Sequence, residues 1–356
     1  MKNNITIVKI GSNTIVDQNG TIRTEIIHDI IKSLQKVMCS GGRVVLITSG
    51  AVRLGRVLLG NNTLATVAAS VGQTCLFDAY YQEAEKVKLK LAQFLLTRPY
   101  IITRGYFLSL QNTFHSLLNQ GILPIVNEND ALVAHTDWSF GDNDSLAAAL
   151  AISLKAEKLI ILSHIEGLFD SDPDKNNNAK LIETVRDVNN ELLKYCSPEA
   201  SAGGRGGMLS KLKAARLVTA VGIETYILSG LVLGNLTKAL NGEKIGTIFL
   251  PRKSDDKISN RDRWLLAAKN SAGSIEIDPG AVIALKKGKS LLAVGVKNVN
   301  GQFNKKEIVE IVDNERQGVA FGIVDYSSSE IKEMLHTNNL KDIQLMHTDN
   351  MINIQN

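Results

Sequence analysis

The sequence contains little cysteine and little histidine. Its three cysteines, Cys39, Cys75 and Cys196, are far apart and include no CxxC pair. This pattern excludes a small disulfide scaffold and offers no metal-ligand spacing, so we expect buried, reduced thiols. The six histidines are scattered and show no Ser–His–Asp arrangement, which disfavours hydrolysis by a nucleophilic side chain.

Long hydrophobic runs are also missing. The N-terminus leads directly into a strand-like segment at residues 5–10, without the apolar core and small-residue cleavage site of an export signal. The longest apolar stretch, residues 145–154, is followed by charged residues from Lys155 onward, well short of the roughly 20 residues that span a bilayer. We therefore expect a cytoplasmic protein without a membrane partner.

The remaining composition is that of an ordinary globular protein of more than one domain. Hydrophobic residues make up 44% and charged residues 21% of the 356 residues, a length at which two domains are the usual expectation. The last 84 residues hold 9 Lys and Arg against 11 Asp and Glu, a net charge of about −2. Because the whole chain has a net charge of +4, the first 272 residues carry about +6. A nucleic-acid partner for the C-terminal part is therefore not favoured.

Short β-branched runs alternate with longer helical stretches up to about residue 250. The predicted strands are residues 5–10, 43–48, 92–96, 123–127, 158–162 and 224–228, and the predicted helices are residues 24–40, 106–119, 144–155 and 211–221. Nearly continuous apolar strands between helices predict an open, mostly parallel αβα sandwich of the α/β class. Ligands bind at the carboxyl ends of such strands, so we expect the chemistry in the loops that follow them.

The pattern changes after Pro251. A polar stretch at 252–263 precedes a short helical run at 264–269, and short strands are then predicted at 274–277, 281–285, 292–299, 307–312 and 318–325. These strands predict a small, β-rich, barrel-like domain. We expect a catalytic domain over 1–251, a linker over 252–271, the small domain over 272–348 and a tail over 349–356.

Two predicted strands end in small, polar turns. Lys9 lies in an apolar strand and is followed by Gly11-Ser12-Asn13-Thr14, where a lysine could meet a phosphate as a point charge. The alternative is a solvated edge lysine. Thr48-Ser49-Gly50-Ala51 closes the second strand similarly, but Ser and Gly at a strand end often mark only a turn.

A third strand ends in Asn127-Glu128-Asn129-Asp130, and Gly141-Asp142-Asn143-Asp144 then opens a helix. Amides and carboxylates at such a place can hold the ammonium and carboxylate of an amino acid. The alternative for the second motif is helix capping, which needs only one of its polar residues. A calcium loop is disfavoured because the EF-hand order of ligands is absent.

A glycine-rich segment, Gly203-Gly204-Arg205-Gly206-Gly207-Met208-Leu209-Ser210-Lys211, leads into a helix. Glycines let backbone N–H groups approach phosphate oxygens, and a helix N-terminus with a lysine favours anions. The segment matches neither Walker A nor GxGxxG spacing, and a flexible linker is the alternative.

Together these features indicate phosphoryl transfer to an anion. A carboxylate acceptor is already ionised at pH 7 and needs no base. The obstacle is its repulsion from the phosphates of ATP, which two lysines and Mg²⁺ would reduce. We expect both lysines at exposed strand or helix ends.

The same motifs, taken jointly and in order, resemble the amino acid kinase family. They are Val8-Lys9-Ile10-Gly11, Thr48-Ser49-Gly50-Ala51, Val126-Asn127-Glu128-Asn129-Asp130, Gly141-Asp142-Asn143-Asp144, Gly167-Leu168-Phe169-Asp170 and Gly206-Gly207-Met208-Leu209-Ser210-Lys211. The most similar branch phosphorylates the γ-carboxylate of L-glutamate, the first step of proline biosynthesis. The segment around Gly280, Gly288 and 318–325 resembles a PUA domain, a module that also occurs in RNA-modifying enzymes.

The resemblance implies roles for individual residues. Lys9 and Lys211 would bind and neutralise phosphates, and Asp144 would organise the two lysines. The glutamate-binding residues would be Ser49, Asn127, Asp130 and Asn143. The ATP-binding residues would be Lys9, Ser163, His164, Arg205, Gly206, Gly207, Met208, Leu209, Ser210 and Lys211. It also implies a homo-oligomer and proline as a feedback inhibitor.

Three positions depart from the family's usual pattern. Ser163-His164 stands where Thr-Asp or Ser-Asp is common, Ser139 stands where many members carry a lysine, and Arg205 replaces a small Thr. The adenine or ribose contact and one cation near the acceptor are therefore open. Other kinases of the family, which phosphorylate N-acetylglutamate, aspartate or UMP, remain alternatives, and an RNA-binding protein is a further one.

Overall fold

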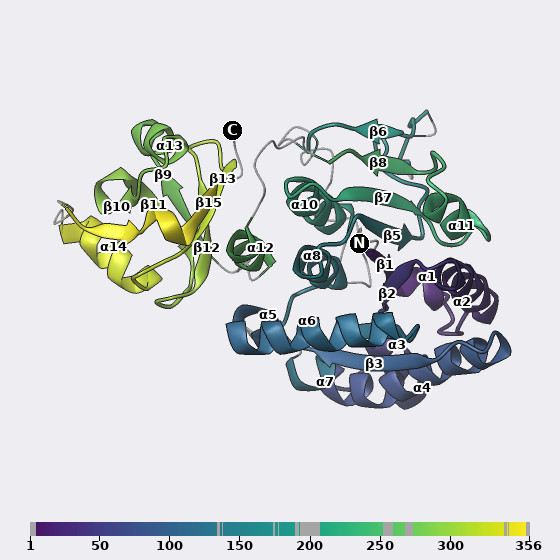
Figure 1. Cartoon of the computed structure of the whole chain (residues 1–356). Coiled ribbons are helices and arrows are strands. Elements are labelled where there is room, and N and C mark those ends of the chain that lie inside the picture. Colours follow the sequence, from purple (N-terminus) through teal and green to yellow (C-terminus); the bar gives the residue numbers. More distant parts are fainter. Residues whose placement is uncertain are drawn as a thin grey trace. The chain divides into compact units, whose positions relative to one another are not determined.

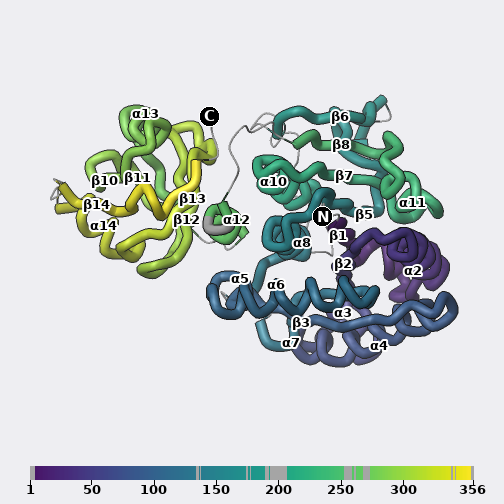
Figure 2. The backbone as a smooth tube through the Cα atoms, in the orientation of Figure 1, coloured from purple at the N-terminus to yellow at the C-terminus, as the bar shows by residue number. Residues whose placement is uncertain are grey.

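The computed structural model describes residues 5–133, 136, 138–173, 175–176, 178–188, 192, 207–251, 259–267, 273–337, 340 and 342–353. The chain divides into two compact units, Met1–Asp255 and Asp256–Asn356. The first unit runs from purple to green in Figures 1 and 2, and the second from green to yellow. Within the described residues, no helix combines the length and the apolar character that a membrane span requires.

The first unit is built on an eight-stranded sheet in the order β3-β4-β2-β1-β5-β7-β8-β6. The strands are β1 Ile5–Ile10, β2 Arg43–Ile47, β3 Leu91–Leu96, β4 Leu123–Glu128, β5 Lys158–Ser163, β6 Thr184–Val185, β7 Glu224–Ser229 and β8 Thr247–Phe249. All neighbouring strands pair in parallel except β7 and β8, which are antiparallel. The carboxyl ends of β4, β2, β1, β5 and β7 therefore lie along one edge of the sheet.

Helices cover both faces of this sheet (Figure 1). One layer contains α6 Arg104–Asn119, α8 Asn143–Ser153 and α10 Met208–Thr219; the other contains α1 Ser12–Ile15, α2 Thr24–Cys39, α4 Ala65–Lys86 and α11 Asn235–Leu240. Shorter helices pack beside these layers: α3 Ala51–Leu59 and α7 Asp130–Val133 contact α4, and α5 Pro99–Ile102 contacts α6.

Side-chain alternation along β1 places Lys9 in this sandwich. Val8 and Ile10 belong to the buried cluster shared with α2, as its residues Ile27 and Ile30 do. Because successive strand residues point to opposite faces, Lys9 faces the other layer, where α8 packs on β1. The lysine is thus directed into the protein and not along its surface.

The predicted α/β sandwich is confirmed, and all six predicted strands are present. The sequence analysis missed β6 and β8, which are only two and three residues long, and the 22-residue helix α4. The buried face of α4 consists largely of glycine and alanine, which pack against α3, while apolar residues such as Val67, Val71 and Tyr81 are exposed. The apolar residues of α4 therefore show little helical periodicity.

The second unit is β-rich, as predicted. A sheet in the order β11-β9-β12-β13-β15 lies beside a two-stranded ladder, β10-β14. The strands are β9 Gly273–Ile277, β10 Leu291–Leu292, β11 Val296–Gly301, β12 Ile308–Val312, β13 Gly318–Ile323, β14 Gln344–Met346 and β15 Met351–Asn353. The helices are α12 Asn260–Ala267, α13 Pro279–Lys286 and α14 Ser328–Thr337, with 3-10 turns at Ala293–Gly295 and Thr348–Asn350.

Several predictions for this region and for the cysteines were wrong. The strand predicted at 281–285 is part of α13, since Pro279 begins the helix and the Asp278 side chain accepts a hydrogen bond from Ala281 N at 2.7 Å. Part of the expected tail forms β15, which pairs with β13. By contrast, the helical run predicted at 264–269 is present as α12, Asn260–Ala267. Cys39 is exposed and Cys75 half-buried, whereas Cys196 lies outside the described residues.

Candidate active site

The predicted site residues of four strands meet at the carboxyl edge of the sheet. Asn127 and Lys9 are each the last residue but one of their strands, β4 and β1, Ser49 follows β2, and Ser163 ends β5. Because β1 is between β2 and β5, Lys9 separates a side that carries the predicted acceptor residues from a side that carries the predicted nucleotide residues.

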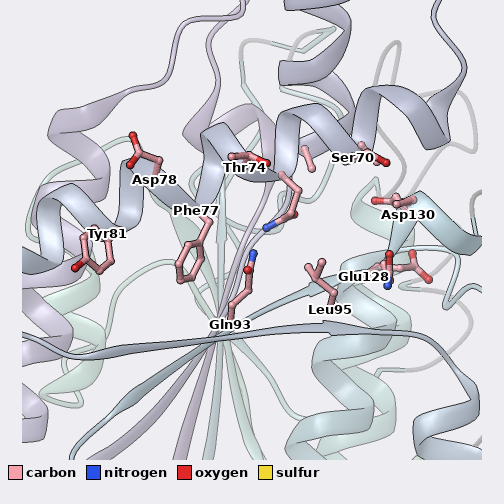
Figure 3. A pocket seen from close by; sticks show the side chains of 14 residues that line it. Ser70, Thr74, Phe77, Asp78, Tyr81, Gln93, Leu95, Glu128 and Asp130 are labelled. Carbon is pink, nitrogen blue, oxygen red and sulfur yellow. The ribbon is translucent and has the colours of Figure 1, made fainter.

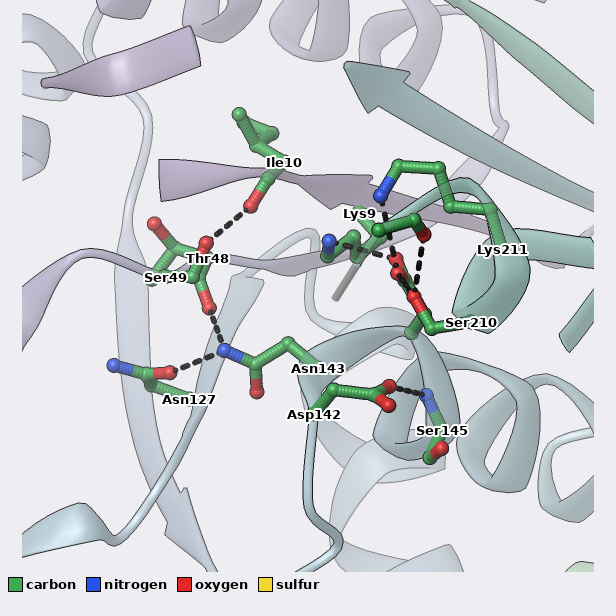
Figure 4. A network of polar contacts seen from close by, with 12 residues as sticks. Lys9, Ile10, Thr48, Ser49, Asn127, Asp142, Asn143, Ser145, Ser210 and Lys211 are labelled. Carbon is green, nitrogen blue, oxygen red and sulfur yellow. Dashed lines mark hydrogen bonds and ion pairs between the residues drawn. The ribbon is translucent and has the colours of Figure 1, made fainter. Parts of the chain in front are cut away.

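A buried carboxylate joins the two predicted catalytic lysines. Lys9 Nζ lies 2.7 Å from Asp144 Oδ1, and Lys211 Nζ lies 3.2 Å from Asp144 Oδ2 (Figure 4). Lys9 is 4%, Lys211 5% and Asp144 0% exposed. The expectation of exposed lysines was therefore wrong, because β1 turns Lys9 toward α8, and α10 packs against both α8 and β7.

The electrostatics of this cluster favour an anionic ligand. Burial alone would raise the pKa of Asp144, but the adjacent charges of Lys9 and Lys211, with hydrogen bonds from Lys9 and Ser210, lower it to about 2. Burial lowers the pKa of Lys211, and the charge of Asp144 opposes that shift. With both lysines charged, two cations share one anion, which leaves one positive charge in a region of low dielectric.

Capping and charge pairing are assigned to different residues of the Gly-Asp-Asn-Asp motif. Asp142 is the N-cap of α8, with its Oδ1 accepting from Ser145 N at 2.7 Å (Figure 4). Burial and the charge of Asp144 raise the pKa of Asp142. Asp144 lies two residues further along and holds the lysines, so capping does not explain its presence.

Asn143 lies between these two acids and turns toward the acceptor side. Its Nδ2 donates to Thr48 O and to Asn127 Oδ1, both at 3.0 Å (Figure 4). Asn143 Oδ1 is buried and has no hydrogen-bond partner among the described residues. An acceptor atom in that situation is suited to a donor group of a ligand.

Ser49 lies beside Asn127 and Asn143, and Asp130 lines a neighbouring cavity. Ser49 Oγ donates to Ile10 O at 2.8 Å, and Gly50, at a φ of +113° that L residues rarely adopt, starts α3. Asp130 is half-buried and lines a cavity of about 490 Å³ between α4 and the ends of β3 and β4 (Figure 3).

On the nucleotide side, α10 begins directly after Gly207. Ser210 Oγ lies 2.6 Å from Asp144 Oδ2, to which it donates, and 2.8 Å from Gly207 O. Met208 and Leu209 form the first turn with Ser210, so their backbone N–H groups point to the N-terminal end, where anions are favoured. Arg205 and Gly206 lie outside the described residues.

The end of β5 is close to the loops after β1 and β7. Ser163 O accepts from Gly230 N at 2.8 Å, and Leu162 O accepts from Gly11 N at 3.0 Å. A Cβ on Gly230 would lie 2.7 Å from Thr14, so only glycine allows this approach. Ser163 is buried, and His164, which differs from the family's usual pattern, is exposed.

Two residues of the site were not found from the sequence, or were given another role. Gln73, in the middle of α4, accepts a hydrogen bond from Asn127 Nδ2 at 2.8 Å, and nothing in its local sequence indicates this. Ser139, noted as a departure, accepts from Gly141 N at 2.9 Å and so shapes the turn before α8.

The described residues contain no group of three or more His, Cys, Asp or Glu side chains able to hold a metal ion. Mg²⁺ commonly binds through substrate phosphates and one or two carboxylates, keeping several waters. Among the described residues there is thus no all-protein metal site, and a magnesium ion would arrive with the nucleotide.

Comparison with known proteins decides the family. The amino acid kinase family matches residues 4–229. The chain belongs to the amino acid kinase family. In addition, a PUA domain matches residues 273–343, in agreement with the resemblance of the C-terminal segment.

Similar family members span nearly the whole chain. A protein named glutamate 5-kinase from Caldanaerobacter subterraneus subsp. tengcongensis is 34% identical over 362 residues, covering 97% of this chain and 96% of that protein. Another protein of that name, from Prochlorococcus marinus, is 36% identical over 354 residues, covering 96% and 98%.

Two solved structures share the fold of the first unit. A carbamate kinase from Giardia lamblia bound to AMP-PNP has a TM-score of 0.51 at 18% identity and covers 70% of this chain and 99% of its own. A UMP kinase from Ureaplasma parvum has a TM-score of 0.50 at 16% identity, with coverage of 70% and 100%. At these identities the likeness concerns the fold alone.

Proposed function

We propose that the chain is an ATP-dependent kinase that phosphorylates the γ-carboxylate of L-glutamate to L-glutamyl 5-phosphate, the first step of proline biosynthesis. The observation that carries this proposal is the buried pair of lysines on one carboxylate, beside an amide cluster with an open acceptor atom. Support for glutamate comes from the relatives named glutamate 5-kinase, which match over nearly the full length of the chain.

The reaction needs charge compensation and positioning. A carboxylate oxygen of the acceptor attacks the γ-phosphorus of ATP, and the bond from that phosphorus to the bridging oxygen of ADP breaks. No proton moves, because the acceptor is already ionised. Lys9, between the two substrate sides, and Lys211, at the start of α10, would neutralise charge on the transferring group.

Other side chains would hold the substrates in line. Asp144 fixes the positions of both ammonium groups. Asn143 Oδ1 would accept from the ammonium of glutamate, with Ser49, Asn127 and Asp130 around it. The first turn of α10, with Arg205 and Gly206 before it, and Ser163-His164 would bind ATP. Mg²⁺ bound to the phosphates would add further charge neutralisation.

An acceptor panel tests the proposal. ADP release is measured with Mg-ATP and, in turn, L-glutamate, L-aspartate, N-acetylglutamate and UMP. We expect a clear preference for L-glutamate. A preference for another acceptor would assign the chain to a different branch of the family.

Oligomer, regulation and location belong to the same proposal. Exposed aliphatic side chains gather at the end of α3 and the start of α4; they are Val57, Leu58, Leu59, Leu64 and Val67. An apolar patch of this kind suits contact with a second copy of the chain, and sedimentation velocity would detect the resulting oligomer.

Proline would act as a feedback inhibitor, which is tested by adding proline to the assay. A biosynthetic kinase that consumes ATP would act in the cytoplasm.

A further inference from the structure

Gln73 connects the long helix α4 to the acceptor side of the site. It lines the cavity of about 490 Å³ between α4 and β3. Its Oε1 accepts a hydrogen bond from Asn127 Nδ2 at 2.8 Å. Asn127 is buried at the end of β4 and bonds to Asn143, so three side-chain amides form a continuous relay.

Two backbone groups fix the orientation of this relay. Glu128 N can only donate, and it donates to Asn127 Oδ1 at 2.9 Å. Thr48 O can only accept, and it accepts from Asn143 Nδ2 at 3.0 Å. These two contacts identify the oxygen of Asn127 and the nitrogen of Asn143. Asn127 therefore presents Nδ2 to Gln73, which must offer its oxygen.

The fixed orientation leaves one atom of the relay available to a ligand. Both hydrogens of Asn143 Nδ2 are used, by Thr48 O and Asn127 Oδ1. Asn143 Oδ1 is buried without a partner among the described residues. That position accepts hydrogen bonds and cannot donate them, so it matches an ammonium group and not a carboxylate.

We infer that Gln73 is a positioning residue which, through Asn127, holds Asn143 Oδ1 toward the α-ammonium of the acceptor and thereby makes the enzyme selective for amino acids over plain dicarboxylates. This inference rests on the proposed function, since it concerns the acceptor of the same reaction. Without an acceptor atom at position 73, Asn127 Nδ2 loses its partner, and the amide of Asn127 no longer holds that of Asn143 in one orientation.

The chain offers a conservative variant and a matched control. Gln73→Leu removes the acceptor atom at similar size, while Gln73→Glu keeps an oxygen in its place. Gln93 on β3 is exposed and lines the same cavity (Figure 3). Gln93→Leu therefore makes the same chemical change in the cavity without altering the hydrogen bonds of Asn127 to Gln73, Glu128 and Asn143.

The experiment compares L-glutamate with glutarate, which has the same two carboxylates and no ammonium. For each full-length variant, kcat and KM are measured at saturating Mg-ATP, with glutarate as substrate and as competitive inhibitor. In Gln73→Leu we expect the KM for L-glutamate to rise about tenfold and the preference over glutarate to fall by a similar factor. The inhibition constant of glutarate, kcat and the KM for ATP change less than about threefold. Gln73→Glu and Gln93→Leu stay within about twofold of wild type.

Other outcomes overturn the inference. Equal losses for glutamate and glutarate in Gln73→Leu mean that Gln73 only supports the fold, and an unchanged preference means that the relay does not set selectivity. A Gln73→Glu variant as impaired as Gln73→Leu excludes the acceptor atom as the cause. Failure of the proposed function looks different, because wild type itself then releases no glutamate-dependent ADP, and the inference falls with it. Circular dichroism of each variant separates lost folding from lost binding.

Discussion

Asp144 is enclosed between two ammonium groups that are themselves almost completely buried. Removing either lysine leaves a buried carboxylate with one partner fewer, so catalysis and stability are coupled at these residues. Breaking such a pair typically costs about 3–5 kcal/mol of stability. Lysines at exposed strand or helix ends, as the sequence predicted, would affect turnover far more than folding; their burial couples the two.

The first prediction concerns the two lysines. Lys9→Met and Lys211→Met each remove a charge that acts on the transferring phosphoryl group, and we expect kcat to fall about 10²–10³-fold. Both variants also unfold at lower urea concentration than wild type. Coupled ADP assays and urea titrations measure the two effects.

Lys158 provides the control for this prediction. It lies at the opposite, amino end of β5, 3.8 Å from Glu224 and over the ring of Tyr226. Lys158→Met should leave kcat within about twofold of wild type. A lysine variant of the cluster with near-normal turnover would remove that lysine from the mechanism.

The second prediction is a pH dependence of stability. The pKa of Asp144 is lowered from its ordinary 3.8 to about 2 in the folded protein. The unfolded chain therefore binds the proton more readily, and the stability from Asp144 is present above about pH 4 and is lost as the pH falls toward 2. It amounts to a few kcal/mol, on the order of 1.4 per pKa unit.

Asp144→Asn isolates this effect. The free energy of unfolding should be lower than in wild type at pH 6, and the difference between the two proteins should shrink as the pH falls from about 4 to about 2. Asp142→Asn is the comparison, because asparagine caps a helix about as well as aspartate and the pKa of Asp142 is raised, not lowered, so removing its charge should not lower the free energy of unfolding at pH 6. A difference that stays constant over this pH range contradicts the assignment of the lowered pKa to Asp144.

At the residue level, the sequence predicted which side chains gather at the sheet edge but not which role each of them has. Strand ends and motif order located Lys9, Asn127 and Asp144. The separation of capping by Asp142 from pairing by Asp144 depends on helix geometry, and the contact of Gln73 with Asn127 joins residues 54 positions apart. Neither is visible in local sequence.

At the scale of elements, the acceptor side depends on how closely α3 and α4 pack. A Cβ on Gly55 would lie 1.8 Å from Ala68 O, and one on Gly72 would lie 1.9 Å from Ala51 O. These backbone contacts cannot yield as a flexible side chain would, so the two helices approach each other only through glycine. Ala51 begins α3 directly after Ser49 and Gly50, and Gln73 follows Gly72, so the contact also positions acceptor residues.

The third prediction tests this packing. Gly72→Ala forces α3 away from α4, and we expect a loss of several kcal/mol in stability with a higher KM for glutamate in any folded fraction. Gly105→Ala in α6 is the matched control, because its Cβ would meet nothing within 4 Å. That variant should be neutral or slightly more stable, since alanine favours a helix. Thermal unfolding compares the two, and equal melting temperatures would contradict the close approach.

Elements with a clear period were predicted well, and those shaped by tertiary contact were not. The strands of the parallel core are continuous apolar runs and were all found. The helix α4 was missed because glycine and alanine replace a regular apolar stripe where it meets α3. The segment 281–285 is short and apolar, which predicted a strand. It forms part of a helix instead, because Pro279 and the capping residue Asp278 before it favour a helix start.

For the whole molecule, the division into two units separates the described site residues from the C-terminal part. Every described residue assigned to the chemistry lies between Lys9 and Lys211, within Met1–Asp255. The composition change after Pro251 indicated the second domain, and its β-rich character followed from short strands punctuated by glycine. Its last strand, β15, was not predicted, because three residues near a terminus give almost no pattern.

The fourth prediction is that a chain truncated after Lys253 folds and still phosphorylates glutamate. A unit with its own core and sheet is expected to be stable alone. Circular dichroism and size exclusion are run beside the coupled assay, because an exposed apolar face would cause aggregation. A folded, monodisperse truncated protein without glutamate-dependent ADP release would show that the second domain contributes to the reaction.

The central claim is that the buried lysines act on a phosphoryl group passing to a carboxylate of glutamate, and trapping the product tests it most directly. An acyl phosphate reacts with hydroxylamine to give a hydroxamate, whose mass and fragmentation identify the carboxylate that was phosphorylated. Wild type with Mg-ATP, L-glutamate and hydroxylamine should form the γ-hydroxamate in equal amount to ADP, and Lys9→Met should form it at least about 10²-fold more slowly. ADP release without γ-hydroxamate, or γ-hydroxamate formation at an unchanged rate in Lys9→Met, would contradict the account.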